Sequence, residues 1–126
     1  MALDGFVISN IVYELNQTIL NAKISKIAQP ENDELLFTCK GSNGQFRLAM
    51  SASASLPFLY LTDQNKPSPM TAPNFCMLLR KHLGSARIGK IMQPGLERVV
   101  EFELEHLNEL GDPCKKYLIE IGRAHV

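Results

Sequence analysis

The sequence predicts an α+β fold in which antiparallel, sandwich-like β-sheets carry two helices. Three observations support this expectation. An amphipathic helical pattern opens the chain, segments of alternating apolar and polar residues follow it, and a second helical pattern interrupts these segments near residue 73. The spacers between the predicted strands are short and turn-like, which is typical of antiparallel sheets.

The first helix is expected to run from Asp4, a good N-cap residue, to about Asn21. Its main apolar face has helical spacing and comprises Ile8, Ile11, Val12, Leu15 and Ile19. A thinner stripe of Phe6, Tyr13 and Leu20 lies on the polar side. We interpret this stripe as packing within the same domain; the alternative is that Phe6 and Tyr13 meet another domain or a partner.

Alternating residues then predict strands at about 24–30, 33–40, 45–50 and 58–62. In the second of these, Leu35, Phe37 and Cys39 share one face. The sequence Gly41-Ser42-Asn43-Gly44 is a hairpin signal. Residues 63–71 are rich in turn formers and are expected to form a loop.

The second helix is expected to open at Pro73 and to close at Gly84. Its predicted apolar face comprises Phe75, Leu78, Leu79 and Leu83. His82 falls in the middle of that face. We interpret it as a hydrogen-bonded core residue; the alternative is a base or a metal ligand.

Strands at 87–92 and 98–105 follow, joined through Pro94-Gly95, and Tyr117, Ile119 and Ile121 mark a last strand after the turn at Asp112-Pro113. In the strand at 98–105, Val100, Phe102 and Leu104 alternate with Glu101, Glu103 and Glu105. We interpret the glutamates as a solvated face. A metal site is the less favoured alternative, because no histidine or aspartate accompanies them at set spacing.

The composition suits one globular domain of 126 residues, with 45% hydrophobic and 21% charged residues. Thirteen basic residues balance thirteen acidic ones, so any nucleic-acid contact must be local. Three cysteines without CxxC spacing and an N-terminus without a basic start favour the cytoplasm. No apolar run is long enough for a membrane span, and no nucleotide-binding or hydrolase motif occurs. We therefore expect no catalytic, cofactor or metal site and no membrane partner.

Basic residues gather in the region 73–98, where Arg80, Lys81, Arg87, Lys90 and Arg98 stand against the single acid Glu97. Such an asymmetry on a neutral chain can steer a polyanion such as RNA. The pair Glu97-Arg98 follows a turn signal. The guanidinium of Arg98 offers a planar fork of hydrogen-bond donors for phosphate oxygens or base edges. The alternative is an ordinary surface ion pair.

Three blocks together resemble the N-terminal domain of the NFACT family: Met1–Gly5, Asn74–Leu83 and Gly95–Phe102. This family includes the bacterial RqcH proteins, often labelled fibronectin-binding protein A, and eukaryotic NEMF. The resemblance covers residues 1–121, which we expect to form the domain, and residues 122–126 are a tail that departs from the family pattern. We expect the chain to be a piece of a longer multidomain protein.

The resemblance implies a role in ribosome-associated quality control. Members bind a large ribosomal subunit obstructed by peptidyl-tRNA, and bacterial members recruit alanyl-tRNA for an untemplated C-terminal alanine tail. The ribosome supplies the chemistry, so the domain is expected to bind tRNA and rRNA and not to be an enzyme. Glu97-Arg98 stands where the family has an Asp-Arg pair that engages tRNA, with Arg80, Lys81, Arg87 and Lys90 as further candidates.

The family's older label gives the alternative function, a surface adhesin that binds fibronectin. The family domain is also similar to the N-terminal domain of formamidopyrimidine-DNA glycosylases, a β-sandwich with flanking helices. Those enzymes use an N-terminal proline amine and a following glutamate, where this chain has Ala2-Leu3. Glycosylase activity is therefore not expected.

Overall fold

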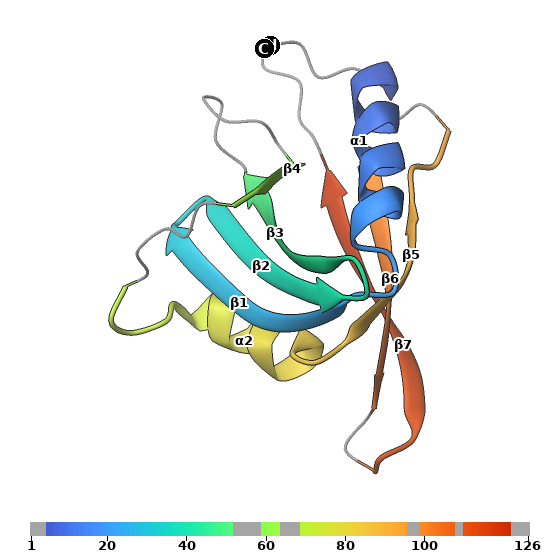
Figure 1. Cartoon of the computed structure of the whole chain (residues 1–126). Helices are drawn as coiled ribbons and strands as arrows, with labels where there is room; N and C mark the ends of the chain where they lie inside the picture. The colour runs from blue at the N-terminus through green and yellow to red at the C-terminus, as the bar shows by residue number, and fades with distance from the viewer. Residues whose placement is uncertain (1–4, 52–58, 64–68, 96–98, 108–109, 122–126) are drawn as a thin grey trace.

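The computed structural model describes residues 5–51, 59–63, 69–95, 99–107 and 110–121. Within these ranges the chain forms two helices and seven strands (Figure 1). Their order is α1 (Gly5–Thr18), β1 (Lys23–Glu31), β2 (Glu34–Gly41), β3 (Gly44–Ser51), β4 (Leu59–Thr62), α2 (Asn74–Leu83), β5 (Arg87–Met92), β6 (Val99–Leu107) and β7 (Pro113–Ile121). The α+β class predicted from the sequence is confirmed.

The described strands form one sheet, in the order β4-β3-β2-β1-β5-β6-β7, with antiparallel neighbours throughout. The prediction of separate, sandwich-like sheets is therefore wrong. Two groups of strands, β1–β4 and β5–β7, are joined where β1 meets β5 (Figure 1). The likeness to glycosylase domains stays a prediction.

The join between β1 and β5 is short, and we call it the seam. It contains the single register pair Lys23–Arg87. Four backbone hydrogen bonds of 2.7–2.9 Å close it: Asn21 N to Ile88 O, Ile88 N to Ala22 O, Ile24 N to Ala86 O, and Ser85 N to Ile24 O. Asn21 and Ser85 both have φ of 68°, so the chain enters the seam from each side through a left-handed residue.

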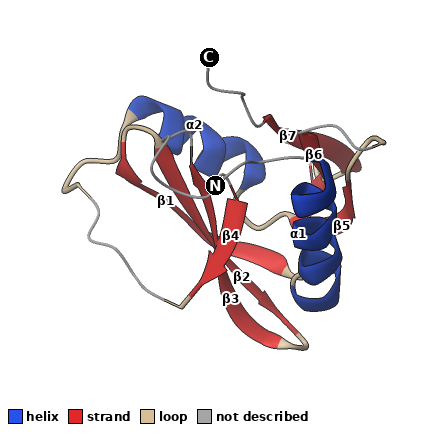
Figure 2. Cartoon of the chain, turned by 90° about the horizontal axis from the view of Figure 1, so that it is seen from above, coloured by secondary structure: helices blue, strands red, loops and turns tan. Residues whose placement is uncertain are grey.

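Helix α1 packs against β5 and β6, whereas α2 packs against β1, as the view from above shows (Figure 2). The main face of α1 is confirmed: Ile8, Leu15 and Ile19 are buried, and Ile11 and Val12 are partly buried against the same core. The expected cap Asp4 lies outside the described residues. The helix ends at Thr18, before the left-handed Asn21.

The thin apolar stripe on the other side of α1 does not pack as a whole within the domain. Leu20 is partly buried against the core, but Phe6 and Tyr13 are 70% and 69% exposed. The interpretation that the whole stripe packs within the domain is therefore wrong. The alternative, in which these two side chains meet another domain or a partner, stays open.

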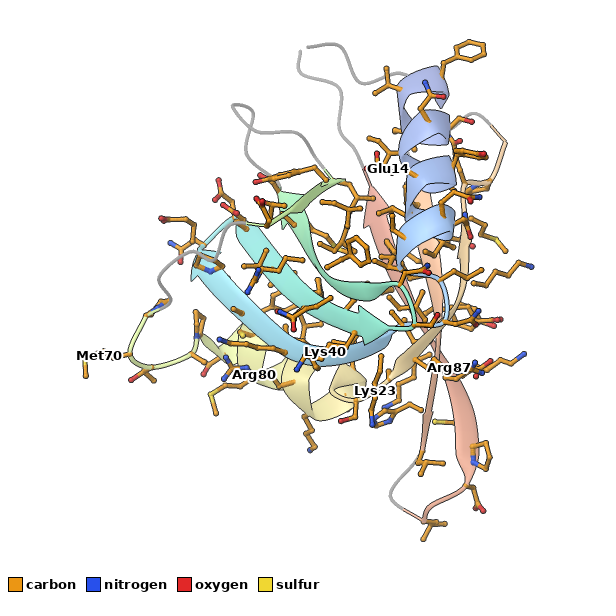
Figure 3. The ribbon with its side chains drawn as sticks, viewed as in Figure 1. Glu14, Lys23, Lys40, Met70, Arg80 and Arg87 are labelled. Atoms are coloured by element: carbon orange, nitrogen blue, oxygen red, sulfur yellow. The ribbon has the colours of Figure 1, made fainter. Side chains whose placement is uncertain are left out.

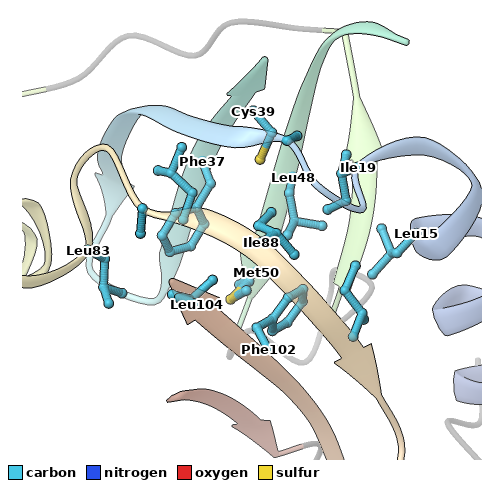
Figure 4. Packing of buried hydrophobic residues seen from close by; sticks show 14 of the residues in the cluster. Leu15, Ile19, Phe37, Cys39, Leu48, Met50, Leu83, Ile88, Phe102 and Leu104 are labelled. Carbon is cyan, nitrogen blue, oxygen red and sulfur yellow. The ribbon is translucent and has the colours of Figure 1, made fainter. Parts of the chain in front are cut away.

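One core fills the space between the two groups of strands. Phe37 and Leu48 from β2 and β3 belong to the same buried cluster as Phe102 and Leu104 from β6 (Figure 4). The predicted alternation of β6 is confirmed, since Val100, Phe102 and Leu104 are buried and the three intervening glutamates are partly exposed. Because apolar side chains of both groups of strands are buried against each other, a single sheet can enclose a core.

Strand β2 buries residues on both of its faces. Phe37 and Cys39 belong to the main core, while Leu36 packs with Ala28 and Ala49 in a small second cluster on the opposite face. The predicted hairpin is confirmed by the register pair Gly41–Gly44, with Gly44 at φ 110°. In the last strand, Tyr117 and Ile119 are more than half exposed.

The buried face of α2 differs from the predicted one. Cys76, Leu79 and Leu83 are buried, whereas Phe75 and Leu78 are 52% exposed. The helix ends at Leu83 as expected, but the left-handed residue is Ser85, because Gly84 has φ of −59°. Glycine is required at position 84 because there is no space for a side chain. A Cβ atom there would lie 2.5 Å from the Arg80 carbonyl oxygen.

We predict that Gly84→Ala destabilises the fold by roughly 1–3 kcal/mol, the usual cost of forced overpacking. Alanine can adopt the backbone conformation at this site, so the 2.5 Å approach to the Arg80 oxygen is the physical cause. Denaturant unfolding measures the change. Gly41→Ala is the matched control, because its Cβ would lie 3.2 Å from Ala22 and needs only a small shift. Equal effects of the two substitutions would contradict the contact argument.

We also predict that Cys39 makes the fold sensitive to alkali. Burial raises the pKa of the Cys39 thiol from 9.0 to about 12. As the pH rises, the thiol ionises in the unfolded chain before it ionises in the folded one. Cys39 therefore leaves the free energy of unfolding unchanged below pH 9.0 and lowers it as the pH rises toward 12. The free energy of unfolding of the native chain should therefore fall more steeply in this range than that of Cys39→Ala. Parallel pH profiles of the two proteins would contradict it.

Candidate nucleic-acid interface

The pair favoured by the sequence, Glu97-Arg98, lies outside the described residues. The chain leaves β5 at Met92 and enters β6 at Val99, with Gly95 exposed and at φ 60° between them. This connection lies at the end of β5 where α1 packs, since Asn16 Nδ2 on α1 donates to the Ile91 carbonyl oxygen at 3.2 Å.

The other predicted basic residues do not form one cluster. Arg80 and Lys81 lie on α2, Lys90 lies within β5, and Arg87 opens β5. Because β5 is an extended strand, Arg87 is about 17 Å along it from Met92, at the opposite end from the β5–β6 connection. The described members therefore lie on two elements, and their part in tRNA binding stays a prediction.

Arg80 has a structural contact. Its Nε donates to the Ile27 carbonyl oxygen at 2.8 Å, and the Cys76 thiol reaches the same oxygen at 3.6 Å. Figure 3 places Arg80 on the side of α2 that meets β1. Past the seam, β1 no longer pairs with β5, and α2 lies beside β1 instead. Side chains of α2 then bond to the β1 backbone in place of a neighbouring strand.

Arg87 and Lys90 lie on a face whose charges balance. Arg87 forms an ion pair with Glu105, and Lys90 stands opposite Glu103 in the register. From the other side, Lys115 approaches Glu103 at 3.9 Å. On the described part of this face of β5–β7, the three cations Arg87, Lys90 and Lys115 therefore equal in number the three carboxylates Glu101, Glu103 and Glu105. Glu103 and Glu105 stand opposite these cations in the register, whereas Glu101 stands opposite Met92 and Ile119.

The glutamate row contacts lysine, arginine and tyrosine side chains. Besides Lys115, the Tyr117 hydroxyl donates to Glu103 at 3.2 Å. Among the residues that the structure describes, no group of three or more His, Cys, Asp or Glu side chains is placed to hold a metal ion.

His82 is exposed, so its predicted place in the core is wrong. The half-buried histidine is His106, whose Nε2 lies 2.9 Å from the Gly84 carbonyl oxygen and therefore donates to it. Lys116 Nζ bridges this region: it donates to the His82 carbonyl oxygen at 2.8 Å and lies 3.5 Å from His106 Nδ1. These contacts tie the end of α2 to the β6–β7 hairpin.

A hollow of about 530 Å³ lies beside these contacts. Cations, a carboxylate and apolar side chains share its wall, which comprises Ser85, Arg87, Glu105, His106, Leu107, Pro113, Cys114 and Lys115. Since Arg87 is already paired with Glu105, the hollow has no strong excess of either charge.

The sequence analysis missed four basic residues on β1–β3: Lys23, Lys26, Lys40 and Arg47. Lys23, Lys26 and Lys40 are exposed, and Arg47 is half-buried. Each occupies a polar position in an alternating strand, and this alternation was the signal that could have grouped them. Their common face depends on strand register, including a bulge between Ile24 and Lys26.

The fold and its basic surfaces define a small α+β domain suited to binding, and comparison with known proteins shows its family. Residues 4–122 match the family model described as "NFACT N-terminal and middle domains". The protein belongs to the NFACT family. The expected domain boundary at residue 121 stays a prediction.

Named relatives fall in the same family. The chain is 36% identical over 126 residues to "Rqc2 homolog RqcH" of Bacillus subtilis, covering 99% of this chain and 22% of that protein. It is 28% identical over 105 residues to "Ribosome quality control complex subunit NEMF homolog" of Drosophila melanogaster, covering 83% of this chain and 10% of that protein. The chain thus spans under a quarter of the length of these relatives.

A solved structure shares the fold. The N-terminal domain of fibronectin-binding protein PavA from Streptococcus pneumoniae superposes with a TM-score of 0.89 at 35% identity, covering 96% of this chain and 46% of that one. The family thus carries names from both ribosome quality control and fibronectin binding. In the described part of this chain, no helix is long and apolar enough to cross a membrane.

We predict that Arg80→Met lowers the free energy of unfolding by about 1–2 kcal/mol, because it leaves the buried Ile27 carbonyl without its closest donor. Lys81→Met is the matched control: it removes one charge from the neighbouring exposed position and should stay within about 0.5 kcal/mol of the native chain. Denaturant unfolding compares the two. If both variants match the native chain, the Arg80 contact does not contribute to the fold.

Proposed function

We propose that this chain is a tRNA- and large-ribosomal-subunit-binding module of ribosome-associated quality control. In this role it helps to recruit alanyl-tRNA, so that a stalled nascent chain receives an untemplated C-terminal alanine tail in the cytoplasm. The observation that carries the proposal is the family match over residues 4–122, together with 36% identity to the Bacillus subtilis RqcH homologue.

The chemistry of the Glu97-Arg98 pair supports a tRNA contact. An arginine guanidinium presents a planar fork of donors that fits phosphate oxygens and base edges, and a neighbouring carboxylate can orient it or accept from a base amino group. The pair belongs to the β5–β6 connection, between Gly95 and Val99. A turn between two paired strands can display such a fork to a large ligand.

In this proposal the chain binds and positions RNA but does not catalyse a reaction. The ribosome joins each alanine to the nascent chain, so the module needs neither a nucleophile nor a bound cofactor of its own. The buried thiol of Cys39 supports this view, because a pKa of about 12 leaves it protonated at neutral pH.

A second candidate function is that of an adhesin that binds fibronectin. The observation in its favour is the close structural likeness to the PavA domain, whose name states that activity. Exposed aromatic residues such as Phe6 and Tyr13 offer protein-binding surface on this chain. The two functions differ in their ligand, so RNA sequencing and fibronectin binding separate them.

We predict that Arg98→Ala, made in the complete natural protein, reduces the tRNA that co-purifies with it while large-subunit rRNA is retained. Sequencing of the bound RNA from cells measures both. Lys115→Ala is the control, since this lysine lies on β7 beside Glu103 and is not among the candidate residues. Absence of both tRNA and rRNA from the native pull-down would sink the proposal and favour the fibronectin-binding function.

A further inference from the structure

The outer face of β1–β3, opposite the main core, carries two rows of basic and polar side chains. Cross-strand register defines the first row as Lys23, Lys40 and Gln45, and the second as Lys26, Thr38 and Arg47. We call the four cations Lys23, Lys26, Lys40 and Arg47 the basic grid. Figure 3 shows Lys23 and Lys40 on adjoining strands. Residues directly opposite on antiparallel strands project from the same face, so the four charges form one surface.

The basic grid lacks the acidic partners that balance the β5–β7 face. Within the described residues, no carboxylate forms an ion pair with any of its four members. The guanidinium of Arg47 donates through Nη1 to a backbone oxygen, that of Asp63, at 3.1 Å. The two groups of strands in this neutral chain therefore differ in charge. On β5–β7 the basic residues have acidic neighbours, whereas the described grid on β1–β3 presents net positive charge.

The position of Lys23 works against folding stability. In the register it stands opposite Lys40 on one side and Arg87 on the other. Like charges directly opposite each other on neighbouring strands are destabilising. A neutral polar residue would be favoured at position 23 if folding alone decided the choice. Lys23 and Lys40 thus concentrate positive charge at this point of the face, and a ligand of opposite charge would offset their repulsion.

The surroundings of the basic grid define what kind of ligand fits. The next row on the same face, Ala28, Leu36 and Ala49, is at most 5% exposed, and the half-buried Tyr60 packs on it. The exposed side chains of the two grid rows are therefore ammonium and amide groups, not an aromatic platform on which bases could stack. Such groups contact phosphates, which position a nucleic acid without reading its sequence.

We propose that the basic grid binds the phosphate backbone of structured RNA independently of sequence, as a second contact surface separate from Glu97-Arg98. This inference rests on the proposed function, which supplies ribosomal RNA and tRNA as the polyanions that the domain meets. The three adjoining strands spread the charges of the basic grid over one face, and the outside of an RNA helix presents accessible phosphates and 2′-hydroxyls to such a face.

The test uses the complete natural protein carrying Lys23→Gln and Lys40→Gln together, with a blunt RNA duplex of mixed sequence as the probe. Each lost phosphate contact should lower the slope of log affinity against log salt by about one, so the double variant should lose about two. Binding should weaken by the same factor for a second duplex of unrelated sequence. Lys115→Gln removes the same charge from an exposed position beside Glu103 and should leave the slope unchanged.

Thermal unfolding of Lys23→Gln separates binding from folding. Because the substitution removes a like charge directly opposite Lys40 in the register, the melting temperature should stay equal or rise while the affinity for RNA falls. Loss of both stability and affinity would overturn the proposal, since the lysine would then be structural. A salt slope that changes no more than in Lys115→Gln would also overturn it.

Two further outcomes keep this inference distinct from the proposed function. If the double variant loses duplex binding while Arg98→Ala retains its tRNA, the basic grid stands and the role of the Glu97-Arg98 pair fails. If the grid instead mediates binding to phosphatidylserine vesicles, with duplex RNA bound equally by native and double-variant protein, the ligand is a membrane surface and the RNA assignment is overturned.

Discussion

Four backbone hydrogen bonds between residues 21–24 and 85–88 hold the two groups of strands in one sheet. Everything else in the arrangement depends on this seam. The strands diverge beyond it, and α2 then covers β1 through the Arg80 and Cys76 contacts to the Ile27 carbonyl oxygen. The core lies between the diverging groups, where Phe37 and Phe102 share one buried cluster although 65 positions separate them in the sequence.

The seam also separates two electrostatic environments. On the β5–β7 side, glutamates alternate along β6, and Glu103 and Glu105 lie beside cations of the neighbouring strands. On the β1–β3 side, Lys23 and Lys40 adjoin without a carboxylate partner among the described residues. A chain with no net charge thereby gains a surface that attracts polyanions, and local excess charge, not the overall balance, decides such attraction.

Local pattern in the sequence predicted the elements well, because alternation and turn residues act over a few positions. The β6 alternation and the Gly41–Gly44 hairpin are examples. The face of α2 could not be predicted in this way, since Phe75, Leu78 and His82 have the same helical spacing as Cys76, Leu79 and Leu83. The second set is the buried one, and its member Cys76 contacts the carbonyl oxygen of Ile27, which is distant in the sequence. The single sheet depends on the pairing of β1 with β5, which are far apart in the sequence, and the basic grid depends on the bulge between Ile24 and Lys26; the local pattern predicted neither.

Amide hydrogen exchange at the seam tests this account most directly. The amide protons of Ile24 and Ile88 donate to Ala86 and Ala22 across it. If the seam holds the two groups of strands together, these protons should exchange only through global unfolding, as slowly as the slowest amides of β2. Exchange at the seam as fast as in the edge strands β4 and β7, while β2 remains protected, would show that the two groups separate without unfolding, and would contradict the account.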